Sequence, residues 1–555
     1  MYLKPFKLTK PSSYLVSILT LLHFSSCTEE VETLYNHSIY TDDIELSIYE
    51  NPEKDTVIAT LNSLDTDAEN TPTYTITSQS LEGLRIVDNQ LIVDDPSVFD
   101  YESISSITGE IEATLGTGTY ISNFTIHLEN SIEEDEAFVM TWETTKANES
   151  IIIYTHADEE KEIYYDYNVD WGDGTLDQNL TDDRSHTYEL PGIYTVTITG
   201  NQFPGITQEN TGNAAKLKSI EAWGTNEWKY LTNGFRDCAN LVINATDTPM
   251  FTEDINLSSL FYGTTNFNSD IGNWDMSNVN NISNMFREAI SFNQDISGWN
   301  TSNIQQMHAV FLDARSFNQS IDSWDMSQVK NTSYMFANAV TFNQDLNSWD
   351  VSNVRNMGHM FKKATQFDGN ISDWNTQNVT TMTYMFNDAV VFNQDISAWD
   401  TSNLLNMNHI FTNAQLFNQD ISAWDVKRVA DMAYAFANVY TFNQDLSNWE
   451  VISVTNMRDM FHNAHAFNQD ISSWNVANVL NMYRMFHNAY AFNQDLSIWD
   501  TSKVVNMGET FKTATAFDQD LSTWDTSSVG NCTNFGQGVS SPNYVSPVFP
   551  EGCSI

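Results

Sequence analysis

The feature that most constrains the fold is a motif repeated every 25 residues. One copy, FNQDISGWNTSNIQQMHAVFLDARS, begins at Phe292, and the next begins at Phe317 without an inserted or lost residue. In all eleven copies Ile or Leu lies four residues after the opening Phe and Trp lies seven residues after it. The opening residues are Phe267, Phe292, Phe317, Phe342, Phe367, Phe392, Phe417, Phe442, Phe467, Phe492 and Phe517. Strict phase indicates stacked coils, because an insertion would displace every later side chain from its neighbours.

The pattern within one copy predicts a helix and a strand. Apolar residues recur at i, i+3, i+4 and i+7, as on one face of a helix; in the copy above they are Met307, Val310, Phe311 and Ala314. Residues 294–300 are expected to form a strand that pairs in parallel with the same segment of the next coil. Strands stack at about 4.8 Å and helices need roughly 8–10 Å, so the array should curve. The predicted fold is an α/β solenoid of eleven coils, preceded by two β-sandwich modules.

Two columns of side chains in this array have alternative interpretations. Asn follows Phe in nine copies, Asp comes two residues later in nine, and Asp or Glu follows Trp in eight. These acids are either weak Ca²⁺ ligands or caps of turn amides. The Trp column is either core or, if exposed, a sugar-stacking strip. The sixth residue after each Phe varies freely, so specificity is expected there; the first six are Asn273, Gly298, Ser323, Ser348, Asp373 and Ala398.

The overall charge of the chain limits its partners. The 555 residues carry a formal charge of −49. Such a surface repels nucleic acid and anionic membranes and suits cations or basic partners. A hydrophobic content of 41% is enough for packed cores.

Residues 1–26 read as an export signal. A lysine-containing start precedes an apolar run too short to span a bilayer, and small residues stand before Cys27. This arrangement resembles a bacterial lipoprotein box, which implies cleavage before Cys27 and its lipidation. An ordinary signal peptide with an incidental cysteine is the alternative. The acidic residues 28–30 resemble tags that send some Bacteroidetes lipoproteins to the outer face of the outer membrane, so an exported, lipid-anchored protein at that surface is expected.

After a linker over 27–36, residues 37–130 show short alternating apolar runs between turn-rich breaks, which predicts a small β-sandwich. Acidic residues at three places in this module resemble a cadherin-type repeat: Glu50, Asp65, Asp67, Asp100 and Glu102. The resemblance implies a Ca²⁺ site, and Ca²⁺ takes six to eight hard oxygen ligands. Exposed turn carboxylates in an acidic chain are the alternative.

The sequence of residues 137–200 predicts a second β-sandwich. The segments WGDG, HTY, PG and YTV within this module resemble a PKD-type immunoglobulin-like domain. Asp173-Gly174 and Pro191-Gly192 are turn signals between alternating strands. His186 has no nucleophile beside it, so a packing or turn-bonding role is expected.

The repeats are expected over 263–526, with an N-terminal cap over 201–262 and a C-terminal cap over 527–555, because the ends of a repeat stack expose apolar surface. In an exported chain three further cysteines leave at least one thiol unpaired. Cys532 and Cys553 are candidates for a disulfide that closes the C-terminal loop, and Cys238 for a buried core residue.

The consensus FNQDISxWDxSNVxNMxxMFxxA, over residues 255–535, resembles the BspA-like leucine-rich-repeat surface proteins. The resemblance implies an α/β leucine-rich-repeat-like solenoid of eleven 25-residue coils, surface exposure, and adhesive or protein-binding roles without catalytic residues. The sequence has no GxSxG, HExxH, P-loop or nucleotide fingerprint, so no enzyme is expected. The favoured function is binding of an extracellular protein or matrix ligand. The alternative is an accessory role in surface polysaccharide binding.

Overall fold

The computed structural model describes residues 36–38, 43–62, 71–101, 103–129, 136–208 and 211–553. The chain divides into two compact units, Met1–Asn130 and Ser131–Ile555. Cys27, the predicted lipidation site, lies outside the described residues.

Two four-stranded sheets make up the described part of the first unit. Their orders are β2-β8-β7-β4 and β1-β3-β6-β5. In β8, alternate side chains from Ser122 to Leu128 are buried, the period of a strand with one face on a core. Ile107 and Phe124 of one sheet share a hydrophobic core with Leu91 and Val93 of the other. The elements are β1 (Asn36–Ser38), β2 (Ile44–Tyr49), β3 (Val57–Asn62), β4 (Thr73–Gln79), β5 (Leu84–Val87), β6 (Gln90–Val93), η1 (Pro96–Val98), β7 (Ser106–Leu115) and β8 (Gly118–Glu129).

The second unit begins with a six-stranded sheet of order β12-β11-β14-β9-β15-β17, beside the hairpin-like pair β10 and β13. Alternate residues of β9, from Phe138 to Thr144, are buried. The elements are β9 (Phe138–Thr144), β10 (Glu149–Ile153), η2 (Glu159–Lys161), β11 (Asp166–Asp170), β12 (Leu176–Leu180), β13 (Arg184–Tyr188), β14 (Gly192–Gln202), α1 (Thr211–Ala214), β15 (Leu217–Ala222) and β17 (Val242–Ile243).

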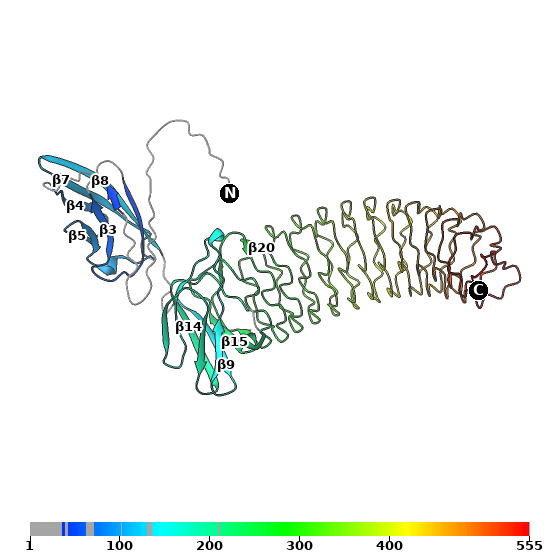
Figure 1. Ribbon diagram of the computed structural model, residues 1–555, viewed down its shortest axis with the longest axis horizontal. Coiled ribbons are helices and arrows are strands. Elements are labelled where there is room, and N and C mark those ends of the chain that lie inside the picture. The colour runs from blue at the N-terminus through cyan, green and yellow to red at the C-terminus, as the bar shows by residue number, and fades with distance from the viewer. Residues whose placement is uncertain are drawn as a thin grey trace. The chain divides into compact units, whose positions relative to one another are not determined.

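The repeats continue from this sheet as a stack of 25-residue coils (Figure 1). β15 pairs with β9 on one side and in parallel with β17 on the other. One hydrophobic core runs from Ala137 to Phe535, so sheet and stack share it. The last strands form the parallel pairs β16·β18 and β19·β20; they are β16 (Glu227–Trp228), β18 (Met250–Phe251), β19 (Ile255–Asn256) and β20 (Val279–Asn281).

The predicted helix of each coil is wrong, and with it the α/β leucine-rich-repeat solenoid. The four-residue α1 is the one α-helix among the described residues. Ala309 and Asp313, inside the predicted helix, have φ of 54° and 61°, and a left-handed residue interrupts a right-handed helix. Their N–H groups donate to Ser333 and Ala337 of the next coil, at 3.0 and 2.8 Å.

The segment is instead a run of tight turns that alternates two kinds of hydrogen bond. Ala309, Phe311 and Asp313 donate to the next coil, whereas Leu312 and Ala314 donate three residues back, to Ala309 and Phe311. The apolar stripe of the predicted helix is nevertheless buried. This run of turns, which we call the turn edge, therefore buries the same i, i+3, i+4, i+7 stripe as a helix would. Part of its backbone hydrogen bonds link one coil to the next.

The predicted strand over 294–300 is also wrong. The Asp295 carboxylate accepts from the Ser297 N–H at 2.9 Å, and the Trp299 N–H donates to Ile296 O at 3.3 Å, which makes this segment a pair of turns. The parallel bridges between coils lie elsewhere, for example between Asn331 and Asn356.

The sequence predicted a curved array because helices need a wider spacing than strands. The described repeats contain no layer of helices beside a layer of strands, so this reason for curvature does not apply. Ring centroids of successive opening phenylalanines lie 5.8–6.1 Å apart. The measured Trp–Trp spacings, 5.8–6.5 Å, are similar. The measured pairs of coils are therefore spaced almost equally at these two columns.

Candidate functional site

The constant side chains of the repeat hold the coils together. From Trp299 to Trp524, each indole N–H donates to the backbone carbonyl of the Ile or Leu in the preceding coil, at 2.8–3.3 Å. The repeat tryptophans are 2–4% exposed. The Trp column is therefore core and offers no aromatic faces for stacking on sugars.

The residue after each opening Phe, Asn in nine copies and Asp in two, links successive coils. The amide or carboxylate oxygen of one coil accepts from the backbone N–H of its counterpart in the next, at 2.7–2.9 Å from Asn268 to Asn543. The acidic column two residues later caps turns instead. The hydroxyl and amide of Ser297 lower the pKa of Asp295 by hydrogen bonding, and those of Ser472 do so for Asp470. These contacts match the turn-capping interpretation.

Three of the columns that vary from coil to coil are positions 17, 18 and 21, counting the opening Phe as position 1. We call these three columns the variable face. It carries five of the chain's 11 His residues, four Tyr and three Arg. Position 17 holds Ser283, His308, Ser333, Gly358, Thr383, Asn408, Ala433, Arg458, Tyr483, Gly508 and Thr533; position 18 holds Asn284, Ala309, Tyr334, His359, Tyr384, His409, Tyr434, Asp459, Arg484, Glu509 and Asn534; position 21 holds Arg287, Leu312, Ala337, Lys362, Asn387, Thr412, Ala437, His462, His487, Lys512 and Gln537. Their composition differs from coil to coil, unlike that of the core columns.

Tyr and His rings at position 18 form a ladder through five coils: Tyr334, His359, Tyr384, His409 and Tyr434. Neighbouring centroids lie 4.2–4.7 Å apart, with planes within 11° of parallel. Burial lowers the pKa of both ladder histidines to about 4. The rings are partly exposed, and at neutral pH the histidines carry no charge. The ladder therefore presents an uncharged aromatic edge.

Guanidinium groups continue the ladder. The Arg458 Cζ lies 5.7 Å from the ring centroid of Tyr434 and 5.0 Å from that of Tyr483. Arg484 lies 5.0 Å from the same Tyr483 ring. Cation–π contacts of this kind hold an Arg side chain in one orientation.

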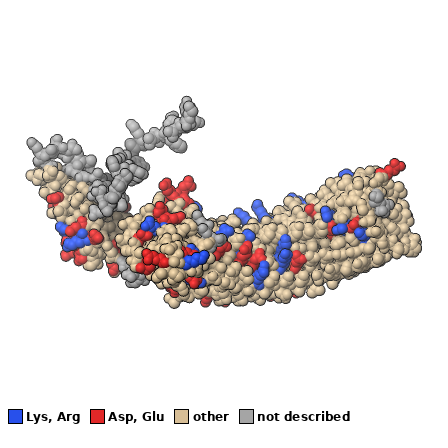
Figure 2. Space-filling model, turned by 60° about the horizontal axis from the view of Figure 1, so that its bottom comes forward, with Lys and Arg blue, Asp and Glu red and all other residues tan. Residues whose placement is uncertain are grey.

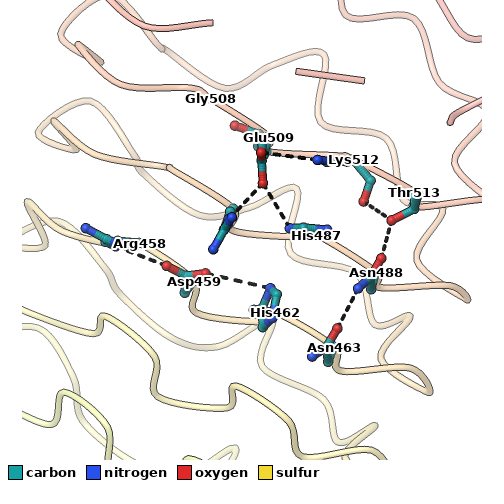
Figure 3. Close-up of polar contacts among 12 residues, drawn as sticks. Arg458, Asp459, His462, Asn463, His487, Asn488, Gly508, Glu509, Lys512 and Thr513 are labelled. Atoms are coloured by element: carbon teal, nitrogen blue, oxygen red, sulfur yellow. Dashed lines mark hydrogen bonds and ion pairs between the residues drawn. The ribbon is translucent and has the colours of Figure 1, made fainter. Parts of the chain in front are cut away.

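Ion pairs surround these two arginines (Figure 3). We call Arg458, Asp459, His462, Arg484, His487, Glu509 and Lys512 the charged cluster. Arg458 Nε lies 3.0 Å from the buried Asp459 carboxylate. Glu509 is 2.7 Å from Arg484 Nε and 3.2 Å from Lys512 Nζ. Each carboxylate in the cluster thus has a cationic partner.

Glu509 and the two histidines of the charged cluster have displaced pKa values. Burial alone would raise the pKa of Glu509, but hydrogen bonds from Arg484 and Lys512 outweigh it and lower the pKa to about 2. Burial lowers the pKa of His487 to about 4, with His462 beside it, and also lowers that of His462. The cluster at neutral pH therefore consists of three cations, two carboxylates and two neutral imidazoles.

On the face of the stack that Figure 2 shows, charged side chains are sparse, and Lys and Arg lie in separate groups beside Asp and Glu.

The predicted calcium ligands are only partly described. Glu50 accepts from the Tyr101 N–H at 2.9 Å, and Asp100 accepts from Ser103. Asp65, Asp67 and Glu102 lie outside the described residues. In the part of the chain that the structure describes, no three His, Cys, Asp or Glu residues are grouped to hold a metal ion. The Ca²⁺ site stays a prediction.

The cysteines and His186 have structural contacts. Cys532 and Cys553 form a disulfide, and Cys238 is a buried free thiol. His186 Nε2 lies 2.8 Å from the Asp173 carboxylate, and its ring stacks on Trp171. Across the described ranges, no helix is both long and apolar enough to cross a membrane.

Sequence reasoning placed specificity at the sixth residue after Phe and missed the variable face. Aligning the eleven copies by column would have revealed the Tyr–His alternation at position 18. The predicted helix concealed this signal, because in a helix those residues would read as an ordinary solvent face.

The structure and the repeats define a class: a repeat protein built of stacked 25-residue coils. A family model described as "Mycoplasma protein of unknown function, DUF285" matches residues 229–349, 333–449 and 430–545. These matches span more than half of the chain, which therefore belongs to this family. A search of curated proteins and a search of solved structures each found no match.

Proposed function

We propose that the chain is a non-catalytic, BspA-like surface protein that binds an extracellular protein or matrix ligand through the variable face. The observation that carries this proposal is that constant and variable residues have different roles within each coil. Constant residues are buried or bonded between coils, whereas the variable face differs from coil to coil.

The composition of the variable face supports a protein ligand. Tyr and Arg are enriched at protein interfaces and dominate their binding energy. Here they lie in one row, from Tyr334 to Arg484, and are partly exposed. Stacking restrains these side chains before a ligand arrives, which lowers the entropy lost on binding.

The polysaccharide alternative rested in part on an exposed Trp column. Those rings are buried, so the alternative loses the aromatic platform on which it rested. A protein ligand is therefore the better proposal.

Location at the cell surface rests on the N-terminal sequence. The lipoprotein-like residues before Cys27 support export and a lipid anchor. The charge of −49 argues against nucleic acid as a partner. The absence of recognisable catalytic motifs supports a binding role.

The test is a binding screen of the chain from residue 28, without its signal and lipid, against immobilised matrix proteins and polysaccharides. We expect saturable binding to a protein. The double variant Tyr384→Ala/His409→Ala should weaken it at least tenfold, because it removes two rings from the ladder. The matched control Ser348→Arg/Ala398→Arg changes two exposed residues at the column first predicted for specificity, and should bind like wild type.

Two results would contradict the proposal. Binding to polysaccharides alone would favour the alternative function. Loss of binding in the control variant, with the ladder variant unaffected, would move the ligand surface to the sixth residue after Phe.

A further inference from the structure

In the coils that begin at Phe442, Phe467 and Phe492, one set of columns carries a net positive charge and another set carries a net negative charge. At positions 17, 18, 21 and 22 they carry three cations, Arg458, Arg484 and Lys512, against two carboxylates. The local sum is one positive charge. At positions 4 and 9 the same coils carry Asp445, Glu450, Asp470, Asp495 and Asp500 without a cation. The coil that begins at Phe342 is also positive at these positions, with Lys362 and Lys363 and no carboxylate, although the chain carries a charge of −49.

The two arginines of the charged cluster are held in place yet accessible. Both lie 5.0 Å from the Tyr483 ring, and each has its Nε beside an internal carboxylate. The Arg458 and Arg484 side chains are still 44% and 36% exposed. A planar guanidinium restrained in this way suits bidentate recognition of a carboxylate.

We propose that the charged cluster anchors the carboxylates of an acidic segment in the protein ligand. This inference rests on the proposed function and deepens it by naming the chemistry of the partner. Arg484 and Arg458 would bind Asp or Glu side chains of that segment, and Lys512 would add the third cation. The neutral imidazoles of His462 and His487 offer hydrogen bonds without opposing charge.

The negative charge elsewhere on the chain does not prevent such binding at physiological salt. The Debye length there is about 8 Å, so exposed charges farther away are largely screened. The ligand would therefore respond to the local charge of the cluster.

A second Arg–Tyr–Arg arrangement near the start of the stack provides a matched control. Arg236 and Arg287 lie 4.5 and 4.9 Å from the Tyr262 ring. Each is paired with a neighbouring carboxylate, Asp237 or Glu288, at 3.5 and 3.3 Å. Two cations and two carboxylates leave this arrangement neutral, so it should not attract an acidic segment.

The experiment measures binding of a fluorescent poly-L-glutamate peptide of about 20 residues to the chain from residue 28 by anisotropy, at about 0.15 M salt. Arg484→Gln should bind about tenfold more weakly, as expected for the loss of one charge-assisted pair. The affinity of Arg484→Lys should lie between those of wild type and Arg484→Gln, because lysine keeps the charge but not the planar fork. Arg236→Gln, outside the variable face, should bind like wild type.

Unchanged melting of Arg484→Gln shows that the variant is folded; if it is not, Lys512→Gln takes its place with the same expectation. No binding of poly-L-glutamate by wild type, or equal loss in Arg236→Gln, overturns the inference. Binding of heparin but not of poly-L-glutamate overturns it too, since the anion would then be a sulfated glycan. A protein ligand found in the screen and bound equally by Arg484→Gln overturns this inference alone and leaves the proposed function intact.

Discussion

Single residues of the repeat combine burial with a hydrogen bond to the neighbouring coil. Each repeat Trp from Trp299 onward fills the core with its ring and satisfies a carbonyl of the preceding coil with its indole N–H. Buried polar groups are costly when unpaired, so this double role explains why Trp stands at that place in every copy. The Asn after Phe has the corresponding role at the coil edge.

The ladder histidines make the stability of the stack depend on pH. The pKa of His359 is about 4 in the folded chain, because of burial and the nearby Lys362, against about 6.5 when unfolded. Between these values the unfolded chain binds a proton that the folded chain does not. The stabilising contribution is therefore complete above pH 6.5 and is lost as the pH falls towards 4.

We expect the denaturation midpoint of the second unit to fall between pH 7 and pH 4.5, and to fall less in His359→Phe, which keeps a flat ring between Tyr334 and Tyr384. Urea titrations at several pH values measure this. Tyr334→Phe is the control and should keep the wild-type pH dependence. An equal pH dependence in His359→Phe and wild type would contradict the prediction.

At the scale of the elements, each coil contributes a turn edge. Its backbone N–H groups donate alternately to carbonyls of the same coil and of the next coil. Residues at positions 18 and 22 carry positive φ in coil after coil, from Asn284 to Thr513. Most residues strain to adopt this conformation, which costs roughly 1–2 kcal/mol for an L-residue. Bonds between coils and buried apolar side chains compensate for it.

Replacement of an exposed residue at position 22 by Gly should therefore stabilise the stack. Lys363 has φ of 59°, so Lys363→Gly relieves this strain and should raise the free energy of unfolding by up to about 1 kcal/mol. The same change in the predicted helix would have lowered it by about 1 kcal/mol. Denaturant unfolding of the full chain measures the difference.

The matched control is Gln366→Gly, three residues away and also exposed. Gln366 lacks a positive φ, so this substitution should lower the free energy of unfolding by about 0.5–1 kcal/mol. A loss in both variants would favour the helix over the turn edge.

For the second unit as a whole, the ends of the stack are closed by different means. At the start, the six-stranded sheet shares the hydrophobic core of the coils. At the other end, the chain returns to the last coil, where Leu521 N–H donates to Val545 O at 2.9 Å, and Phe549 packs on Phe535. Both ends thus cover apolar surface that a bare coil would expose.

The disulfide between Cys532 and Cys553 should stabilise this last segment. Its cysteines are 21 residues apart, for which the chain-entropy model gives about 3 kcal/mol. Cys532→Ser/Cys553→Ser should lower the thermal midpoint of the second unit, and a reducing agent should lower that of wild type only. Equal stability of the two forms would show that the returning C-terminal segment closes the stack without the disulfide.

The repeat period, the core residues and the capping role of the acidic columns could be predicted from the sequence, because each depends on spacing along one chain. Phe, Ile or Leu, and Trp recur in phase, and their burial follows from stacking whatever the backbone does. The i, i+3, i+4, i+7 stripe correctly identified Met307 and Phe311 as core. The candidate site was missed, since the column of Tyr334 and His359 acquires meaning only when neighbouring coils lie side by side.

The sequence by itself determined the 25-residue coil, its core and the repeat family, whereas only the tertiary structure decided the backbone path. Local spacing fits a helix and a turn edge equally well. The choice between them lies in hydrogen bonds such as that from Ala309 to Ser333 in the next coil. A partner 24 residues away cannot be read from local periodicity, and it overrides the helix by engaging alternate N–H groups. The same packing assembles the aromatic ladder and the charged cluster, so the proposed ligand surface exists only in the stacked chain.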